Sequence, residues 1–143
     1  MVDVEPVEPD VVVLGPAEGF DPPDVSLRDA AAVVAGGRQA GNFDLVGCLA
    51  EKVDAYLAGD RGAWDAGLID SERIVDVRGV TVSPELYVAI GIRGDTFHNA
   101  AMKESRFIIA IHPDPSAPIF ELADLCVEAE PEDVLPALLD ALD

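Results

Sequence analysis

Basic side chains are rare in this chain, and they stand where strands are expected to end. The 143 residues include 28 Asp and Glu against nine Lys and Arg, which gives a formal net charge of −19. Arginine or histidine occurs just past or between the expected strands, at Arg38, Arg61, Arg78, Arg93 and His112. Guanidinium groups bind phosphate in a bidentate manner, so this distribution favours an anionic ligand such as a pyrophosphate. Pairing of the same arginines with nearby carboxylates explains the distribution equally well.

No motif for hydrolytic or nucleophilic catalysis is present. None of the serines stands in a Gly-x-Ser-x-Gly context. Cys48 and Cys126 have no Cys or His neighbours at metal-ligand spacing, so we expect buried thiols rather than a disulfide or a metal site. Acidic residues are so numerous that pairs at a catalytic spacing arise by chance, and we interpret them as a charged surface.

The apolar pattern predicts the elements that must position these side chains. Continuous runs rich in β-branched residues predict buried parallel strands at Ala31–Ala35, Leu86–Ile92 and Phe107–Ile111, with a further strand in Leu122–Val127. Helices are expected after Asn42, over Thr96–Lys103 and from Pro131. Strands that alternate with helices predict an α/β fold with a doubly wound, mostly parallel sheet. Ligands of such sheets bind outside the carboxyl ends of the strands.

Composition also bounds the domain organisation and the partners. Five prolines among acidic residues predict that residues 1–26 form an extended arm, and that residues 27–143 form one domain. The negative charge argues against nucleic acid and anionic membranes as partners. No apolar run reaches the ~18 residues of a membrane span and no basic-then-apolar leader opens the chain, which predicts a cytoplasmic protein. Two lysines beside seven arginines and a large excess of acid indicate a halophile's protein.

Several segments together resemble one known family. They are Ala35–Arg38, Asp65–Gly67, Ser83–Ile92, Met102–Ser105, Ala110–Pro115 and Ala117–Glu121. In order and near register, they are similar to the flavin-binding domain of the electron transfer flavoprotein alpha subunit, from about Leu27 to Leu142. The resemblance implies a Rossmann-like FAD domain that carries electrons from dehydrogenases to a quinone-side acceptor, rather than an enzyme that turns over a substrate. It also implies a beta-type subunit as partner, and a self-dimer is the alternative.

The resemblance assigns roles to individual residues. Arg38 matches the arginine of a Gly-Gly-Arg loop, and Arg61 matches the arginine over the isoalloxazine ring, with Asp65 placed to orient it. His98 matches a histidine that donates at the pyrimidine edge of the flavin. Gly94 matches the glycine of the phosphate-facing loop. We therefore expect the pyrophosphate against residues 93–98, with the backbone N–H groups after Gly94 pointing at it and Arg38 close by.

Other positions depart from the family pattern. Asp60 stands where the family has serine, Arg78 and Arg93 replace hydroxyl residues, and His112 replaces an asparagine on the ribose side. The two arginines would put charge at the pyrophosphate. Three interpretations follow from the sequence: a domain that binds FAD and passes electrons, a domain for a different nucleotide, and a degenerate relative that serves as an interaction or regulatory domain.

Overall fold

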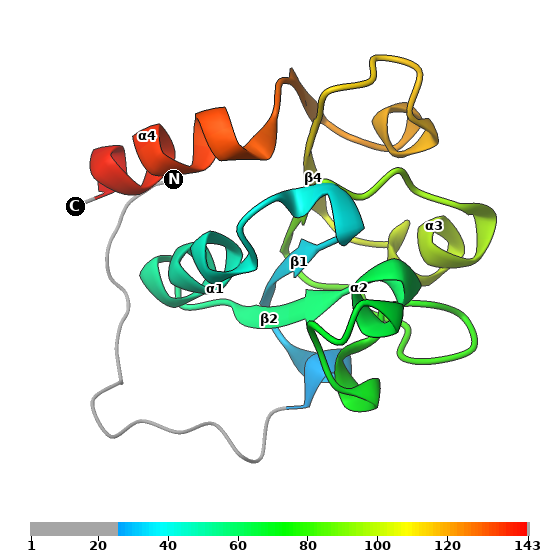
Figure 1. The fold of residues 1–143 in the computed structure, drawn as a ribbon. Coiled ribbons are helices and arrows are strands. Elements are labelled where there is room, and N and C mark those ends of the chain that lie inside the picture. Colours follow the sequence, from blue (N-terminus) through cyan, green and yellow to red (C-terminus); the bar gives the residue numbers. More distant parts are fainter. Residues whose placement is uncertain (1–25, 143) are drawn as a thin grey trace, which may run out of the picture.

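Five parallel strands form one sheet in the computed structural model, which describes residues 26–142 (Figure 1). The strands are β1 (Ala32–Gly36), β2 (Tyr56–Gly59), β3 (Leu86–Ile90), β4 (Phe107–His112) and β5 (Leu125–Glu128). Their order across the sheet is β2-β1-β3-β4-β5, and every neighbouring pair is parallel. The expected parallel α/β fold is confirmed, and β3 lies at its centre.

Helices pack on both faces of the sheet and close two apolar cores. The helices are α1 (Phe43–Lys52), α2 (Arg61–Asp65), α3 (Thr96–Met102) and α4 (Pro131–Leu142). On one face, Val46 and Leu49 of α1 and Leu135 of α4 pack in one buried cluster with side chains of β1, β3 and β4. On the other face, Met102 of α3 belongs to a second cluster. Apolar residues on both faces of the central strands explain why their sequences are continuously apolar.

Local chemistry sets where these elements begin and end. Asn42 caps α1, because its side chain accepts the Asp44 N–H at 2.9 Å. The expected strand over Leu86–Ile92 ends at Ile90, because Gly91 takes a φ of +66°, which a strand cannot continue. The expected strand in Leu122–Val127 starts later, at Leu125, because a 3₁₀ turn, η4 (Pro118–Glu121), uses Leu122 as its C-cap.

Two elements were not anticipated from the sequence. Strand β2 has only four residues and ends in Ala58-Gly59, so it lacks the β-branched run that marks the other strands. Helix α2 begins directly after it at Arg61, a residue that was expected in a loop. The arm expected for residues 1–26 lies, except for Ser26, outside the described residues. Between Ser26 and Leu142, no helix has the length and apolar character needed to cross a membrane.

The two cysteines are exposed, which corrects the expectation of buried thiols. Cys48 lies on the outward side of α1, between the buried Val46 and Leu49, and Cys126 lies on the edge strand β5. Both are free thiols. In the described part of the chain, no group of His, Cys, Asp or Glu could hold a metal ion.

Candidate functional site

The site lies where the chain leaves β1 and β3 in opposite directions. The loop after β1 leads to α1 on one face, and the loop after β3 leads to α3 on the other face. The Gly37 N–H donates to the Ile90 carbonyl at 2.9 Å, and a side chain at Gly91 would overlap the backbone of Gln39 and Ala40. The two loops therefore touch through their backbones. A point where neighbouring strands diverge in this way is the usual ligand site of a doubly wound sheet.

Exposed arginines surround this end of the sheet. Arg38 opens η2 (Arg38–Ala40), and its Nη2 donates to the Gly62 carbonyl at 3.5 Å, which links this turn to α2. Arg93 follows β3, and its Nη1 donates to Asp114 Oδ2 at 2.6 Å. Hydrogen bonding from Arg93 lowers the pKa of Asp114 well below its ordinary value. The carboxylate therefore stays ionised and holds the loops after β3 and β4 together.

His112 fastens the loop after β1 to the end of β4. Its Nδ1 accepts the Asp114 N–H at 3.0 Å, so its Nε2 carries the proton and donates to Gln39 Oε1 at 2.7 Å. Burial lowers the pKa of His112, which keeps this neutral tautomer. Both ring nitrogens bind protein atoms, so the structure gives His112 a structural role. The family resemblance had placed this residue on the ribose side.

The start of α2 combines an acid and a stacked arginine. Asp60 caps the helix, because its Oδ1 accepts the Ala63 N–H at 2.9 Å. The Arg61 guanidinium lies over the Trp64 ring at 5.1 Å from its centroid. This contact replaces the expected pairing of Arg61 with Asp65, which is exposed and lies one turn along the same helix. Trp64 is 38% exposed, so the stacked pair faces solvent.

Burial raises the pKa of Asp60, and the nearby Asp95 carboxylate acts in the same direction. The Ala63 N–H and His98 act in the opposite direction. Partial burial therefore disfavours the ionised form of Asp60.

Arg78 is bound to a buried acid two residues before it. Asp76 is 1% exposed, and its carboxylate accepts the backbone N–H, Nε and Nη2 of Arg78 at 2.8, 2.9 and 3.0 Å. The Arg78 guanidinium also lies over the Phe97 ring of α3, 4.2 Å from its centroid. Hydrogen bonding between the two side chains lowers the pKa of Asp76 and raises that of Arg78, so both stay charged.

His98 is buried inside the domain, which corrects its expected role as a donor to a flavin. Its Nδ1 donates to the Val75 carbonyl at 2.8 Å, and its Nε2 accepts the Tyr87 hydroxyl at 3.1 Å. Burial lowers the pKa of His98 and favours the neutral ring. Neither nitrogen of this tautomer has a proton left for a ligand.

The backbone after Gly94 is only partly free. Asp95 caps α3, and its Oδ1 accepts the His98 N–H at 2.7 Å, while the Asn99 N–H donates to the Asp95 carbonyl. Within residues 93–98, the His98 N–H therefore points at Asp95 and is not available to a pyrophosphate. Carboxylates of Asp60 and Asp95 stand at the starts of α2 and α3, where they repel an approaching anion.

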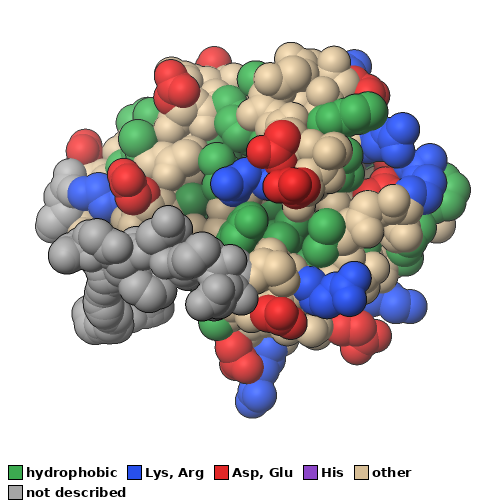
Figure 2. Space-filling model, turned by 90° about the horizontal axis from the view of Figure 1, so that it is seen from below, with side chains coloured by type: hydrophobic (Ala, Val, Ile, Leu, Met, Phe, Trp, Pro, Cys, Tyr) green, Lys and Arg blue, Asp and Glu red, His purple; other side chains and the backbone are tan. Residues whose placement is uncertain are grey.

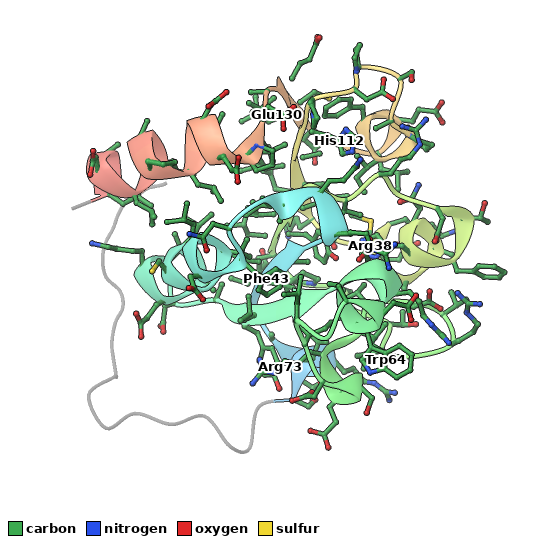
Figure 3. All side chains as sticks on the ribbon, viewed as in Figure 1. Arg38, Phe43, Trp64, Arg73, His112 and Glu130 are labelled. Atoms are coloured by element: carbon green, nitrogen blue, oxygen red, sulfur yellow. The ribbon has the colours of Figure 1, made fainter. Side chains whose placement is uncertain are left out.

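Figure 3 shows the side chains that the chain brings to this end. Arg38 and Trp64 extend on one side of the sheet and His112 lies above them, whereas Arg73 lies near the start of β1. Sequence reasoning missed the supporting residues Gln39, Trp64, Phe97 and Asn99, and it did not anticipate that Asp76 binds Arg78. Asp76 precedes Arg78 by two residues, a spacing typical of an Asp side chain that binds nearby backbone, and it was the one available signal.

The pairing of arginines with carboxylates, the simpler explanation for their distribution, holds for two of them. Arg78 pairs with Asp76, and Arg93 pairs with Asp114. Within the described residues, Arg38 and Arg61 form no ion pair and keep exposed guanidinium groups. Exposed arginines at the point where the strands of a doubly wound sheet diverge are typical of a nucleotide-binding α/β domain.

Comparison with known proteins identifies the kind of nucleotide-binding domain. Residues 26–103, more than half of the chain, match the family model of the electron transfer flavoprotein FAD-binding domain. The chain is 44% identical over 119 residues to the probable mitochondrial electron transfer flavoprotein subunit alpha of Caenorhabditis elegans. That match covers 81% of this chain and 36% of the relative.

Other alpha subunits match over similar lengths. The probable mitochondrial subunit of Cryptococcus neoformans var. neoformans (strain JEC21) is 45% identical over 121 residues, with 82% of this chain and 35% of the relative covered. The alpha subunit of Mycobacterium leprae is 38% identical over 135 residues, with 92% of this chain and 42% of the relative covered. The chain thus spans about two fifths of these relatives or less. It belongs to the electron transfer flavoprotein alpha FAD-binding domain family, and FAD is the cofactor of that domain.

The residues at the carboxyl end of the sheet fit FAD. Guanidinium groups suit its diphosphate, and Gly94, at a φ of +90°, leaves no room for a side chain, since a Cβ would lie 2.7 Å from Asn99 Oδ1. The same Asn99 oxygen is buried and accepts no hydrogen bond in the described part of the chain. A flavin dinucleotide carries several hydroxyl donors, so an acceptor without a partner beside this loop is consistent with such a ligand. The acids Asp60 and Asp95 oppose the diphosphate charge, and both carboxylates are used as helix caps.

Proposed function

We propose that this chain holds FAD against the loops after β1 and β3 and acts as the flavin domain of an electron transfer flavoprotein. The observation that carries the proposal is the set of exposed arginines on these touching loops in a protein that is otherwise strongly acidic. Arg38 and Arg93 flank the diphosphate, and Arg61 lies toward the ring. The proposed cofactor contacts are Arg38, Arg61, Arg78, Arg93 and Gly94, with Asp65, His98 and His112 around them.

Bound FAD supplies the capacity to accept and release electrons. Arg61, which lies over Trp64, places a positive charge near the ring and favours the form of the flavin that carries more negative charge. His98 cannot donate to the flavin ring from its buried, neutral tautomer. Its role is structural, because its hydrogen bonds to the Val75 carbonyl and the Tyr87 hydroxyl join residue 75 to β3.

A beta-type subunit, a dehydrogenase and a quinone-side acceptor are the proposed partners, with a cytoplasmic location. The matched alpha subunits are longer proteins, and this sequence covers 36% and 42% of two of them. Residues 27–143 are proposed as the flavin domain, preceded by the acidic arm of residues 1–26.

The proposal is tested by titrating the purified chain with FAD in molar KCl and measuring flavin fluorescence and the visible absorption spectrum. Wild-type protein should bind FAD in a saturable manner and become yellow, and Arg93→Ala should weaken binding about tenfold or more because a charge-assisted contact is lost. Arg106→Ala is the matched control, because Arg106 is an exposed arginine paired with Glu85 before β3 and β4 begin. Colourless protein at excess FAD, or equal losses in both variants, contradicts the proposal.

A further inference from the structure

One arginine at the site is built into its position far more firmly than the others. Arg78 uses its backbone N–H, Nε and Nη2 to bind the carboxylate of Asp76, and its guanidinium lies over the Phe97 ring. Arg38 and Arg61 have no comparable support in the described residues. A guanidinium group that is hydrogen-bonded along one edge and covered by an aromatic ring loses most of the rotamer freedom of its side chain.

The loop that carries Arg78 is itself braced. Gly79 donates to the Asp76 carbonyl at 2.7 Å, and Val80 donates to the Ile74 carbonyl at 2.9 Å. A Cβ at Gly79 would lie 2.7 Å from the Ile74 oxygen, so the turn admits only glycine there without rearrangement. The backbone N–H of Val77 donates to the Phe97 carbonyl at 3.2 Å, which ties the loop to α3. These bonds fix the base from which the Arg78 side chain extends.

The anchor of this loop places it at the carboxyl end of the sheet. The Val75 N–H donates to the Gly59 carbonyl at 2.8 Å, at the last residue of β2 and immediately before Asp60 and Arg61. Helix α2 begins with Arg61, two residues after Gly59. Arg78 therefore belongs to the same site as Arg61.

Arg78 keeps one edge available. Its side chain is 49% exposed although Asp76 is buried, and Nη1 has no acceptor among residues 26–142. A buried carboxylate that receives three bonds from one arginine is satisfied and stays ionised, so it acts as a fixed support. The pair is close to neutral at long range, and what it offers a ligand is a donor edge of fixed direction.

We propose that Arg78 is an oriented cation that stabilises negative charge on the flavin ring, and that Asp76 and Phe97 are its positioning residues. This inference rests on the proposed FAD site. It assigns to residues 76, 78 and 97 a joint effect on the reduction potential of the bound flavin, in addition to any effect on affinity. An arginine without these supports would stabilise the reduced flavin less, because its guanidinium would be hydrated and would have to be ordered first.

The direction in which Asp76→Asn shifts the midpoint potential distinguishes an effect of Arg78 orientation from an effect of charge alone. Asp76→Asn removes a negative charge, so an account based on charge alone predicts a higher midpoint potential. Orientation predicts the opposite: released Arg78 stabilises reduced flavin less, and the ratio of reduced to oxidised binding constants falls about tenfold. For two electrons, that ratio corresponds to a midpoint lower by about 30 mV. Phe97→Leu should lower the midpoint in the same direction without any change of charge.

Asp70→Asn is the matched control, because the chain contains a similar unit elsewhere. Asp70 pairs with Arg73 at 3.7 Å, and the Arg73 guanidinium lies over Tyr56, 5.0 Å from the ring centroid. Figure 3 shows Arg73 near the start of β1, far along the sheet from Arg38. This variant removes the same charge from the same kind of unit and should leave the midpoint unchanged.

The experiment measures the FAD dissociation constant and the midpoint potential by dye equilibration with dithionite in molar KCl, after thermal melting shows that each variant is folded. In an Arg78→Gln background, Asp76→Asn should raise the midpoint, because only its charge effect remains. A midpoint that rises or stays constant in Asp76→Asn with Arg78 intact overturns the inference. An unchanged midpoint in Phe97→Leu does the same, and Phe97 is suited to this test because it is 47% exposed. Wild-type protein that binds no FAD overturns the proposed function, and a bound flavin with an insensitive midpoint overturns this inference alone.

Discussion

Replacing Asp60 by serine should strengthen FAD binding, because it removes a negative charge at the start of α2 without removing the helix cap. The carboxylate of Asp60 accepts the Ala63 N–H at 2.9 Å, and a serine hydroxyl caps a helix about as well as aspartate does. The free energy of unfolding should therefore change by less than about 0.5 kcal/mol. The substitution isolates the charge.

The magnitude follows from Coulomb's law and the partial burial of Asp60. Two unit charges about 8 Å apart interact by about 2 kcal/mol at an effective dielectric constant of about 20. Solvent at the partly exposed carboxylate reduces this to about 1 kcal/mol, which is about a fivefold gain in affinity. Because burial raises the pKa of Asp60, its charge is lost as pH falls through that raised value. The difference between wild type and variant should therefore shrink as the pH is lowered.

The assay is FAD titration by fluorescence quenching at several pH values, with Asp70→Ser as the control. Asp70 also caps a short helical turn, by accepting the Glu72 N–H at 3.1 Å. It pairs with Arg73, which lies near the start of β1 and far along the sheet from Arg38. The control should bind FAD as the wild type does. Equal or weaker FAD binding by Asp60→Ser, with its melting temperature preserved, would refute the reasoning that Asp60 faces the anionic ligand.

Three further outcomes follow from the described structure and composition. The thermal midpoint should rise as KCl is increased from about 0.1 M into the molar range, because 28 carboxylates then repel one another less, and a flat or falling midpoint contradicts the halophile interpretation. NMR titration should give His98 and His112 pKa values below 6.5, since burial disfavours their charged forms. Because the unfolded chain then takes up protons that the fold does not, stability should fall as pH drops below about 6.5, and a histidine titrating at or above 6.5 is the contrary result. Cys48 and Cys126 should both react with a thiol reagent in the folded protein, and protection of either thiol contradicts their exposure.

The salt prediction concerns the whole chain. Seven of the 28 acidic residues and none of the nine basic ones precede Ser26. The face seen from below in Figure 2 intermixes basic, acidic and apolar side chains. We therefore expect the acidic residues before Ser26 to contribute to the predicted effect of salt.

The central strands could be predicted because burial on both faces leaves a direct mark on sequence. Strands β3 and β4 are runs of apolar, β-branched residues, and no competing pattern has the same length. Strand β2 could not be found in this way, since an edge strand of four residues ending in Ala58-Gly59 depends on pairing with β1 rather than on its own propensity. Exposure of Cys48 was missed because neighbouring residues of one helix face opposite environments.

The site was predicted better in its place than in its contacts. Parallel strands bring the loops after β1 and β3 to one edge whatever their sequences, so the clustering of Arg38 and Arg93 followed from topology. The use of both ring nitrogens of His98 inside the protein depends on the positions of Val75 and Tyr87, which are distant in sequence. The binding of Arg78 to Asp76 likewise depends on a turn closed by Gly79. Such tertiary contacts leave no periodic signal in the chain.

Mapping FAD on the protein by amide NMR is the most direct test of the proposed site. On addition of FAD to ¹⁵N-labelled chain in molar KCl, the largest shift changes should fall on residues 37–40, 76–79 and 93–98, at the loops after β1 and β3 and at the Arg78 loop. Residues 70–73, which carry a similar arginine and carboxylate near the other end of β1, should change little. Changes centred on residues 70–73, or the absence of any saturable change, would contradict the placement of the flavin at the carboxyl end of the sheet.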